Sequence, residues 1–137
     1  MTITPYNTDN NDGNFFDEEA LDDMKTLMKE RFPVLVENYL RSAEGYVAAA
    51  QSALHNKDLG SLINALHPLK ASSQSLGLTA LHDAAARIEE SARKLSGQEQ
   101  NIPPDFPALF GDLFAVFTKS EKLLKEAVKH HDTNKPA

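Results

Sequence analysis

The stretch "NALHPLKASSQSLGLTAL", residues 64–81, combines a helical pattern with a polar face that packing does not explain. Apolar or small residues recur in it at intervals of three and four, as one buried face of a helix requires: Leu66, Leu69, Ser73 and Leu76. His67 stands beside that stripe, and Pro68 follows it. A proline inside a helix removes one backbone hydrogen bond, so a helix that only packs has no use for it. The stretch therefore predicts a helix that also carries a functional face.

The same periodicity extends outward on both sides and predicts five helices. A short one covers residues 17–30, with Leu21, Met24, Leu27 and Met28 at helical spacing. The four long helices run from Phe32 to about Asn56, from an Asp58 cap to Gly77, from a Thr79 cap to Gly97, and from an Asp105 cap through Val128. The phenylalanines of the last helix are expected in the core: Phe106, Phe110, Phe114 and Phe117.

No segment has the alternation of a strand, so the fold class is all-α. Four long amphipathic helices with short connections predict an antiparallel up-down-up-down four-helix bundle, with the short additional N-terminal helix packed across one end. Residues 1–14 are rich in Asn, Asp and Thr and are expected to be a disordered lead. Residues 15–131 form the predicted domain, and residues 132–137 a flexible tail.

Composition narrows the possible partners. The 137 residues carry 14 Lys and Arg against 20 acidic residues, and this net charge of −6 gives no broad basic surface for nucleic acid. No apolar run approaches the roughly 18 residues of a membrane span, and no signal peptide is evident, so a cytoplasmic protein with protein partners is expected. Cysteine is absent, and no Glu-x-x-His pair suggests a di-iron bundle, so no metal site is predicted.

The polar face around His67 is the candidate site. Its neighbours three, four and seven residues away are polar or small: Asn64, Lys70, Ala71 and Gln74. Leu66 and Leu69 are expected to bury the other side of the helix. The side chain of His67 is therefore expected to be reached from outside.

An acidic residue is expected opposite the histidine. In an antiparallel hairpin that turns near Leu78, residues eleven before and eleven after the turn lie level, which pairs His67 with Glu89. A carboxylate can accept the Nδ1 proton of an imidazole and leave Nε2 as the outward nucleophile. Lys70, about one turn on, would offer a positive charge to an incoming phosphoryl group. An error of one residue in the register would put Glu90 in this place.

The segment "HPLKASSQSLG", residues 67–77, resembles the signature of histidine phosphotransfer domains, His-x-Leu-Lys-Gly-Ser-Ser-x-x-Leu-Gly. The helix pattern is similar over about residues 17–130. The resemblance implies that His67 is the phosphoacceptor, that Lys70 faces the phosphoryl group, and that an acidic residue such as Glu89 bonds the histidine. Ala71 stands where the family usually has glycine, and Pro68 fills a variable position and should bend the helix near the site.

The resemblance also implies how such a chain works. It would be a monomeric phosphocarrier without kinase activity of its own, which exchanges its phosphoryl group with an aspartate in a response-regulator receiver domain. A hybrid sensor histidine kinase would be the other partner. No cofactor is expected in the chain, because Mg²⁺ would come with the receiver. Asn64, Ala71 and Gln74 would line the partner-binding surface.

Two alternatives from other classes stay open on the sequence alone. A helical adaptor could bind a receiver or a kinase without carrying phosphate. A metal-storing bundle would contain stoichiometric iron or zinc. Phosphate on His67 would separate the carrier from both.

Overall fold

The computed structural model describes residues 15–95 and 102–133. Over these residues the chain forms α2 (Glu18–Met28), the 3-10 helix η1 (Lys29–Arg31), α3 (Phe32–His55), α4 (Leu59–Ser75), α5 (Thr79–Leu95) and α6 (Phe106–Thr133). Within this part of the chain no strand is present, so the predicted all-α class is confirmed. The lead expected at residues 1–14 lies outside the described residues.

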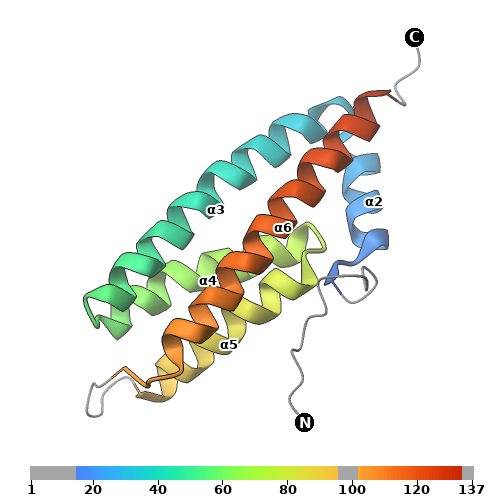
Figure 1. Cartoon of the computed structure of the whole chain (residues 1–137). Helices are drawn as coiled ribbons and strands as arrows, with labels where there is room; N and C mark the ends of the chain where they lie inside the picture. Colours follow the sequence, from blue (N-terminus) through green and yellow to red (C-terminus); the bar gives the residue numbers. More distant parts are fainter. Residues whose placement is uncertain (1–14, 96–101, 134–137) are drawn as a thin grey trace.

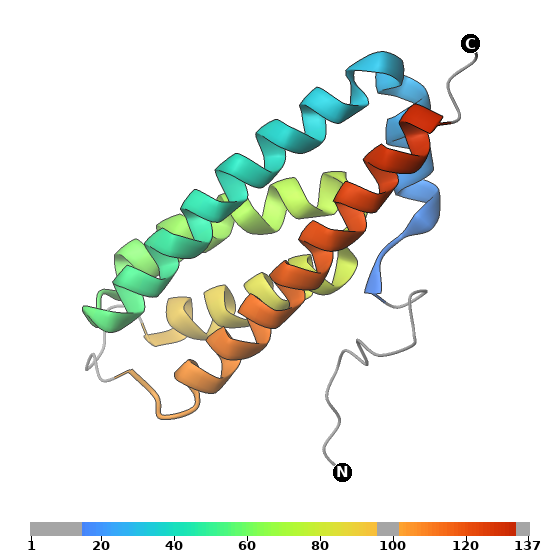
Figure 2. The same cartoon turned by 45° about the horizontal axis from the view of Figure 1, so that its top comes forward.

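The four long helices form an antiparallel up-down-up-down bundle. α3 packs against α4, α4 against α5, and α5 against α6, and α6 closes the ring by packing against α3. Figure 1 shows the alternating directions, and in Figure 2 α2 crosses the end of the bundle where α3 begins. The predicted architecture, including the short N-terminal helix, is confirmed.

Local signals explain where the helices start and stop. Asp17 and Asp58 precede α2 and α4, and the carboxylate of each accepts a backbone N–H three residues on, at 3.1 Å. Proline at the start of α3 suits a first turn. The predicted cap at Thr79 is wrong, because Thr79 already belongs to α5 and its hydroxyl donates to the carbonyl oxygen of Gly77, 3.4 Å away.

The core runs along the facing sides of all four long helices. The predicted stripe of α4 is buried throughout: Leu59, Leu62, Ile63, Leu66, Leu69, Ser73 and Leu76. Phe15, just before α2, is also buried, and the ammonium of Lys119 lies 4.6 Å from the centre of its ring. Among the described residues, Phe15 is thus the first member of the core.

One predicted core residue, Phe114, is exposed. It lies just outside the arc of α6 that Leu113 and Phe117 bury, and 51% of its surface is exposed. The spacing alone overestimated the width of the buried face.

The last helix, α6, continues to Thr133. Residues 134–137 lie outside the described residues, as does the predicted helix end at Gly97. No helix among the described residues is long and apolar enough to cross a membrane.

Candidate functional site

His67 is displayed on the outer face of α4. Its side chain is 60% exposed, while Leu66 and Leu69 on either side of it are fully buried. The predicted neighbours Asn64, Ala71 and Gln74 are all exposed. The helix thus anchors itself through leucines and leaves the imidazole accessible.

The helix accommodates Pro68 without interruption. α4 continues through the proline to Ser75. The hydroxyl of Ser72, one turn later, donates a 2.8 Å hydrogen bond to the carbonyl oxygen of Pro68. Pro68 has no N–H to donate to the carbonyl four residues earlier, and the Ser72 bond adds a side-chain contact one turn beyond that gap.

The histidine is held from α5 by Glu89. Nδ1 of His67 lies 3.0 Å from Oε2 of Glu89, and the Glu89 side chain is only 2% exposed. Because a carboxylate can only accept, Nδ1 is the donor in this contact, and in the neutral ring Nε2 then has a free lone pair. The pairing predicted from the helix register is present, whereas Glu90 is exposed.

Glu89 is the centre of a small charged cluster. Nζ of Lys70 lies 2.9 Å from Oε1 of Glu89, and the two groups form an ion pair. Oε1 accepts no hydrogen bond from the described residues, so this ion pair is its contact. On Oε2 the carboxylate also accepts from Nε and Nη2 of Arg93, at 2.9 and 2.7 Å. A buried carboxylate is thus balanced by two cations and one imidazole N–H.

These contacts decide the ionisation of Glu89. Burial acts to raise the pKa of its carboxyl, but the contacts with Lys70, Arg93 and His67 outweigh burial and lower the pKa to about 2. Glu89 is therefore a carboxylate throughout the physiological range. It can hold the Nδ1 proton and can stabilise positive charge on the ring.

Arg93 was missed in the sequence analysis. It lies four residues after Glu89 on α5, a spacing at which acidic and basic side chains commonly pair. That spacing is a signal the sequence contains, but surface pairs of this kind are common and usually weak. Only the burial of Glu89 gives this pair its importance.

Ser73 of the motif serves the helix packing. Ser73 is fully buried, and its hydroxyl donates to the carbonyl oxygen of Leu69 at 2.6 Å and accepts from the phenol of Tyr39 at 2.7 Å. Burial raises the pKa of Tyr39 to about 12, which keeps the phenol protonated as a donor. This pair ties α4 to α3 behind the histidine.

Gly77 makes the turn that sets the register of α4 against α5. Its φ is 74°, a left-handed conformation that L side chains rarely adopt. Its N–H bonds to the carbonyl of Gln74, and the next N–H bonds to that of Ser73, which closes α4. Across the turn, Nδ1 of His82 contacts the carbonyl oxygen of Lys70 at 3.0 Å.

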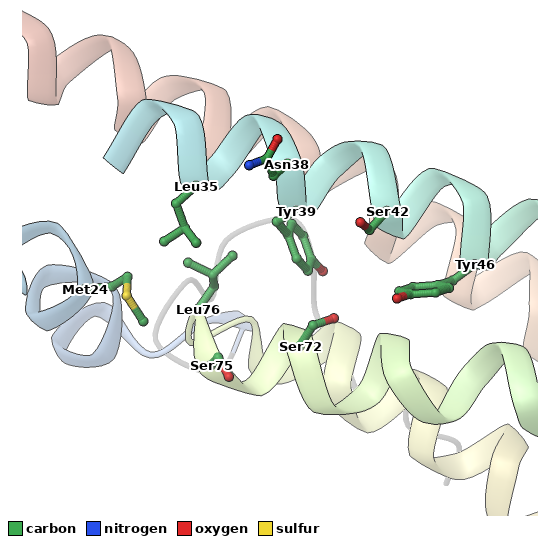
Figure 3. Close-up of a pocket in the computed structure, with 9 residues that line it drawn as sticks. All are labelled: Met24, Leu35, Asn38, Tyr39, Ser42, Tyr46, Ser72, Ser75 and Leu76. Carbon is green, nitrogen blue, oxygen red and sulfur yellow. The ribbon is translucent and has the colours of Figure 1, made fainter. Parts of the chain in front are cut away.

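A groove of about 290 Å³ opens between α2, α3 and α4. Figure 3 shows the side chains that line it: Met24, Leu35, Asn38, Tyr39, Ser42, Tyr46, Ser72, Ser75 and Leu76. The lining is mainly apolar, with hydroxyl and amide groups among the hydrocarbon. Two of its residues lie on α4 only five and eight positions after His67, so the groove adjoins the segment that carries the site.

The described residues contain no group of three or more side chains suited to hold a metal ion. The dispersed histidines of the sequence are not gathered elsewhere into such a cluster in this part of the chain. The cluster around Glu89 is instead a carboxylate among cations. Its chemistry suits the approach of an anion to Nε2 of His67.

Comparisons with known proteins agree with this geometry. A family model described as the Hpt domain matches residues 34–130, and no curated protein gives a match. Among solved structures, the chain is similar to the crystal structure of histidine-containing phosphotransfer protein B (HptB) from Pseudomonas aeruginosa PAO1. The identity is 24%, the match covers 85% of this chain and 96% of that chain, and the TM-score is 0.74, a likeness of fold. Because the family match spans well over half of the sequence and includes the whole site, the chain belongs to the Hpt domain family.

Proposed function

We propose that this chain is a phosphocarrier that accepts a phosphoryl group on Nε2 of His67 and exchanges it with an aspartate of a response-regulator receiver domain. The observation that carries the proposal is the 3.0 Å contact of Nδ1 with a buried carboxylate beside an exposed imidazole edge. Membership of the Hpt domain family supports the same histidine phosphotransfer role in a phosphorelay.

The transfer step follows from the tautomer. The Nε2 lone pair attacks the phosphorus of the receiver's aspartyl phosphate, and the bond from phosphorus to the aspartate oxygen breaks with its electrons left on the carboxylate. The proton on Nδ1 stays, so the phosphorylated ring is a cation. Glu89 accepts from that N–H and stabilises the positive charge as it develops.

Lys70 is the proposed cation for the phosphoryl group. Its side chain is 29% exposed, so the ammonium can reach the solvent side of the site as well as Oε1 of Glu89. Lys70 follows His67 by three residues and lies on the same face of α4. Its charge partly neutralises the phosphoryl oxygens during transfer.

The partner surface is proposed to surround the histidine. Asn64, Ala71 and Gln74 form the exposed face of α4 beside His67, and the groove between α2, α3 and α4 offers a further surface for a helix of the receiver. A receiver must bring its phosphoaspartate to within about 3 to 3.5 Å of Nε2, and small neighbours leave room for that approach. A hybrid sensor histidine kinase is the proposed second partner.

The chain is proposed to be a monomer without kinase activity of its own. The nucleotide and the metal chemistry of the relay belong to its partners, and the chain supplies the histidine and its electrostatic setting. The chain must share a compartment with those partners to exchange the phosphoryl group. We propose that this compartment is the cytoplasm, as expected from the sequence. An adaptor that never carries phosphate is the alternative.

The decisive experiment is phosphoryl transfer from a labelled receiver to the wild type and to His67→Gln, with His55→Gln as the control. His55 lies at the exposed end of α3. Wild type and His55→Gln are expected to acquire acid-labile label, and His67→Gln none, with the same helical content and melting temperature. Labelling of His67→Gln would refute the site, and unlabelled wild type would favour the adaptor.

A further inference from the structure

Arg93 makes the closest contact with Glu89. Its Nη2 and Nε lie 2.7 and 2.9 Å from Oε2, compared with 3.0 Å for Nδ1 of His67 on the same oxygen. Both nitrogens are donors of one rigid guanidinium, and both point at Oε2, the same oxygen that accepts from His67. Arg93 thus contributes to the orientation of the oxygen that His67 uses.

Lys70 and Arg93 bind different oxygens and are exposed to different degrees. Lys70 makes its ion pair with Oε1, whereas Arg93 donates to Oε2. When Lys70 turns toward a phosphoryl group, Oε1 loses the cation beside it. A carboxylate that is only 2% exposed cannot be left without a counter-ion at little cost. The cation that stays on it is Arg93.

We propose that Arg93 is a positioning residue, which keeps the Glu89 carboxylate paired and aimed at Nδ1 of His67 while Lys70 turns to the arriving phosphoryl group. This inference rests on the phosphotransfer function proposed above. The charged or titratable groups in contact with Glu89 are His67 and Lys70 from α4 and Arg93 from α5 itself. Arg93 acts through Glu89 and not on the phosphoryl group.

The chemistry of the step makes this role useful. Attack by Nε2 turns the imidazole into a cation without moving the Nδ1 proton, so the ring depends most on Glu89 at the moment when Lys70 is drawn away. A carboxylate held by Arg93 remains ionised and aligned at that moment. Without Arg93, Lys70 is needed at Glu89 and at the phosphoryl group at the same time.

The first test reads the site without any phosphate. Arg93→Gln removes the charge, Arg93→Lys keeps the charge with a single donor group, and Lys94→Gln removes an exposed charge from the same turn of α5 as a matched control. Carbon-13 NMR of the Glu89 carboxyl and nitrogen-15 NMR of His67 are followed against pH. In Arg93→Gln the pKa of Glu89 is expected to rise from about 2 toward the ordinary carboxyl range, and the Nδ1–H tautomer to lose population.

In the same experiment Arg93→Lys is expected to recover most of the wild-type behaviour, and Lys94→Gln to match the wild type. An unchanged carboxyl titration and tautomer in Arg93→Gln would overturn the proposal. An equal change of the carboxyl titration and the tautomer in Lys94→Gln would also overturn it. The effect would then come from the positive charge at the end of α5 and not from the contact of Arg93 with Glu89. Arg93 is 54% exposed, so its replacement leaves the apolar core intact. Circular dichroism verifies that the bundle folds, and melting curves measure what the buried carboxylate loses with its partner.

The second test follows labelling of the four forms by phosphoramidate, a small phosphoryl donor that needs no docking. Arg93→Gln is expected to slow labelling on the order of tenfold, the scale of one charge-assisted hydrogen bond. Wild-type rates in Arg93→Gln would overturn the positioning role during transfer. If the wild type takes no label at His67, the phosphocarrier function fails and this role fails with it, whereas the NMR result still decides whether Arg93 orients Glu89.

Discussion

At the scale of single residues, the histidine depends on a carboxylate that solvent hardly reaches. Glu89 makes an ion pair with Lys70, accepts from Arg93 and His67, and is itself held in the interface between α4 and α5. Exposed ion pairs contribute little to stability, but a buried carboxylate that loses its partners is costly. Glu89 therefore couples the chemistry of His67 to the stability of the fold.

Replacement of Glu89 by alanine is expected to slow phosphotransfer without abolishing it. The hydrogen bond to Nδ1 fixes the tautomer and the ring orientation, while the new bond to phosphorus is made by Nε2. A loss of about tenfold, or about 1.4 kcal/mol, fits one such contact. Single-turnover transfer from a labelled receiver measures it, with exposed Glu90→Ala as the control. A larger effect from Glu90→Ala would mean that Glu90, and not Glu89, contacts His67.

The low pKa of Glu89 predicts a pH-dependent stability. Its pKa is about 2 in the folded chain against an ordinary value of 4.5, so the ionised form favours folding. This contribution is complete above the unfolded pKa and is lost as the pH falls toward 2. It amounts to on the order of 3 kcal/mol.

Urea unfolding of the wild type and of Glu89→Gln between pH 6 and about pH 2 measures this contribution. The wild-type free energy of unfolding is expected to fall more steeply with acid, and the difference between the two proteins to shrink. Parallel curves would show that Glu89 does not contribute through its charge.

The sequence predicted part of this cluster and missed the rest for a physical reason. The spacing about the turn was enough to pair His67 with Glu89, because both helices rise by the same amount per residue. Arg93 was missed because an acidic and a basic residue four positions apart give the same sequence pattern in two cases. Both side chains can be solvated, or the carboxylate can be buried. Depth of burial depends on how α4 and α5 pack, which spacing does not contain.

At the scale of helices, Gly77 holds the hairpin that aligns His67 with Glu89. A Cβ at this position would lie 2.6 Å from the carbonyl oxygen of Asp17, whose own N–H bonds to the Gly77 carbonyl. Gly77→Ala is therefore expected to cost about 1–3 kcal/mol of unfolding free energy, from the left-handed φ and from the displaced segment before α2.

Chemical denaturation measures this loss, and Gly111→Ala is the control. Gly111 lies inside α6, and a Cβ there would meet nothing within 4 Å. Alanine at that position is expected to stabilise the chain by about 0.5–1 kcal/mol, because glycine is a poor helix former. If Gly77→Ala and Gly111→Ala changed the free energy of unfolding equally, the turn at Gly77 would not disfavour a side chain.

Helix faces were predicted better than their edges. The stripe of α4 is buried as expected, because its residues face α3 and α5 from both sides. Phe114 lies one step beyond the covered arc, and the predicted cap at Thr79 is the first residue of α5. The width of a covered arc depends on the neighbouring helices, so periodicity in one helix cannot fix it.

The exposed face of α4 predicts how a partner approaches. Ala71 follows His67 by four residues and is exposed, so its methyl group lies beside the imidazole on the same face. Ala71→Leu is expected to leave the bundle folded but to reduce receiver binding and transfer strongly, whereas Ala71→Gly should preserve both.

Titration calorimetry and label transfer, compared among the three forms at position 71, measure the effect, and circular dichroism verifies folding. The central part of an interface carries most of its energy, so a bulky side chain there should matter. Transfer at the wild-type rate by Ala71→Leu would mean that the receiver docks on another face.

At the scale of the whole molecule, the bundle keeps the imidazole of His67 at its surface. Tyr39 and Ser73 tie α4 to α3, and the Glu89 cluster ties α4 to α5, so the histidine is fixed from both sides. Nothing in this arrangement requires the bundle to open for transfer. The surface at His67 is ready for a partner that brings the remaining chemistry.

Removal of Mg²⁺ tests that division of labour. The described residues hold no candidate metal cluster, and the proposed function assigns the metal to the receiver. With a chelator present, transfer between receiver and His67 is expected to stop, since the aspartyl phosphate loses the cation that offsets its charge. The melting temperature of this chain alone should not change, and the phosphoryl group already on His67 should remain there. Added Mg²⁺ should restore transfer in the same sample. A chelator-induced fall in the melting temperature would instead show that the chain binds a metal of its own. The receiver would then not be the only source of metal for the transfer.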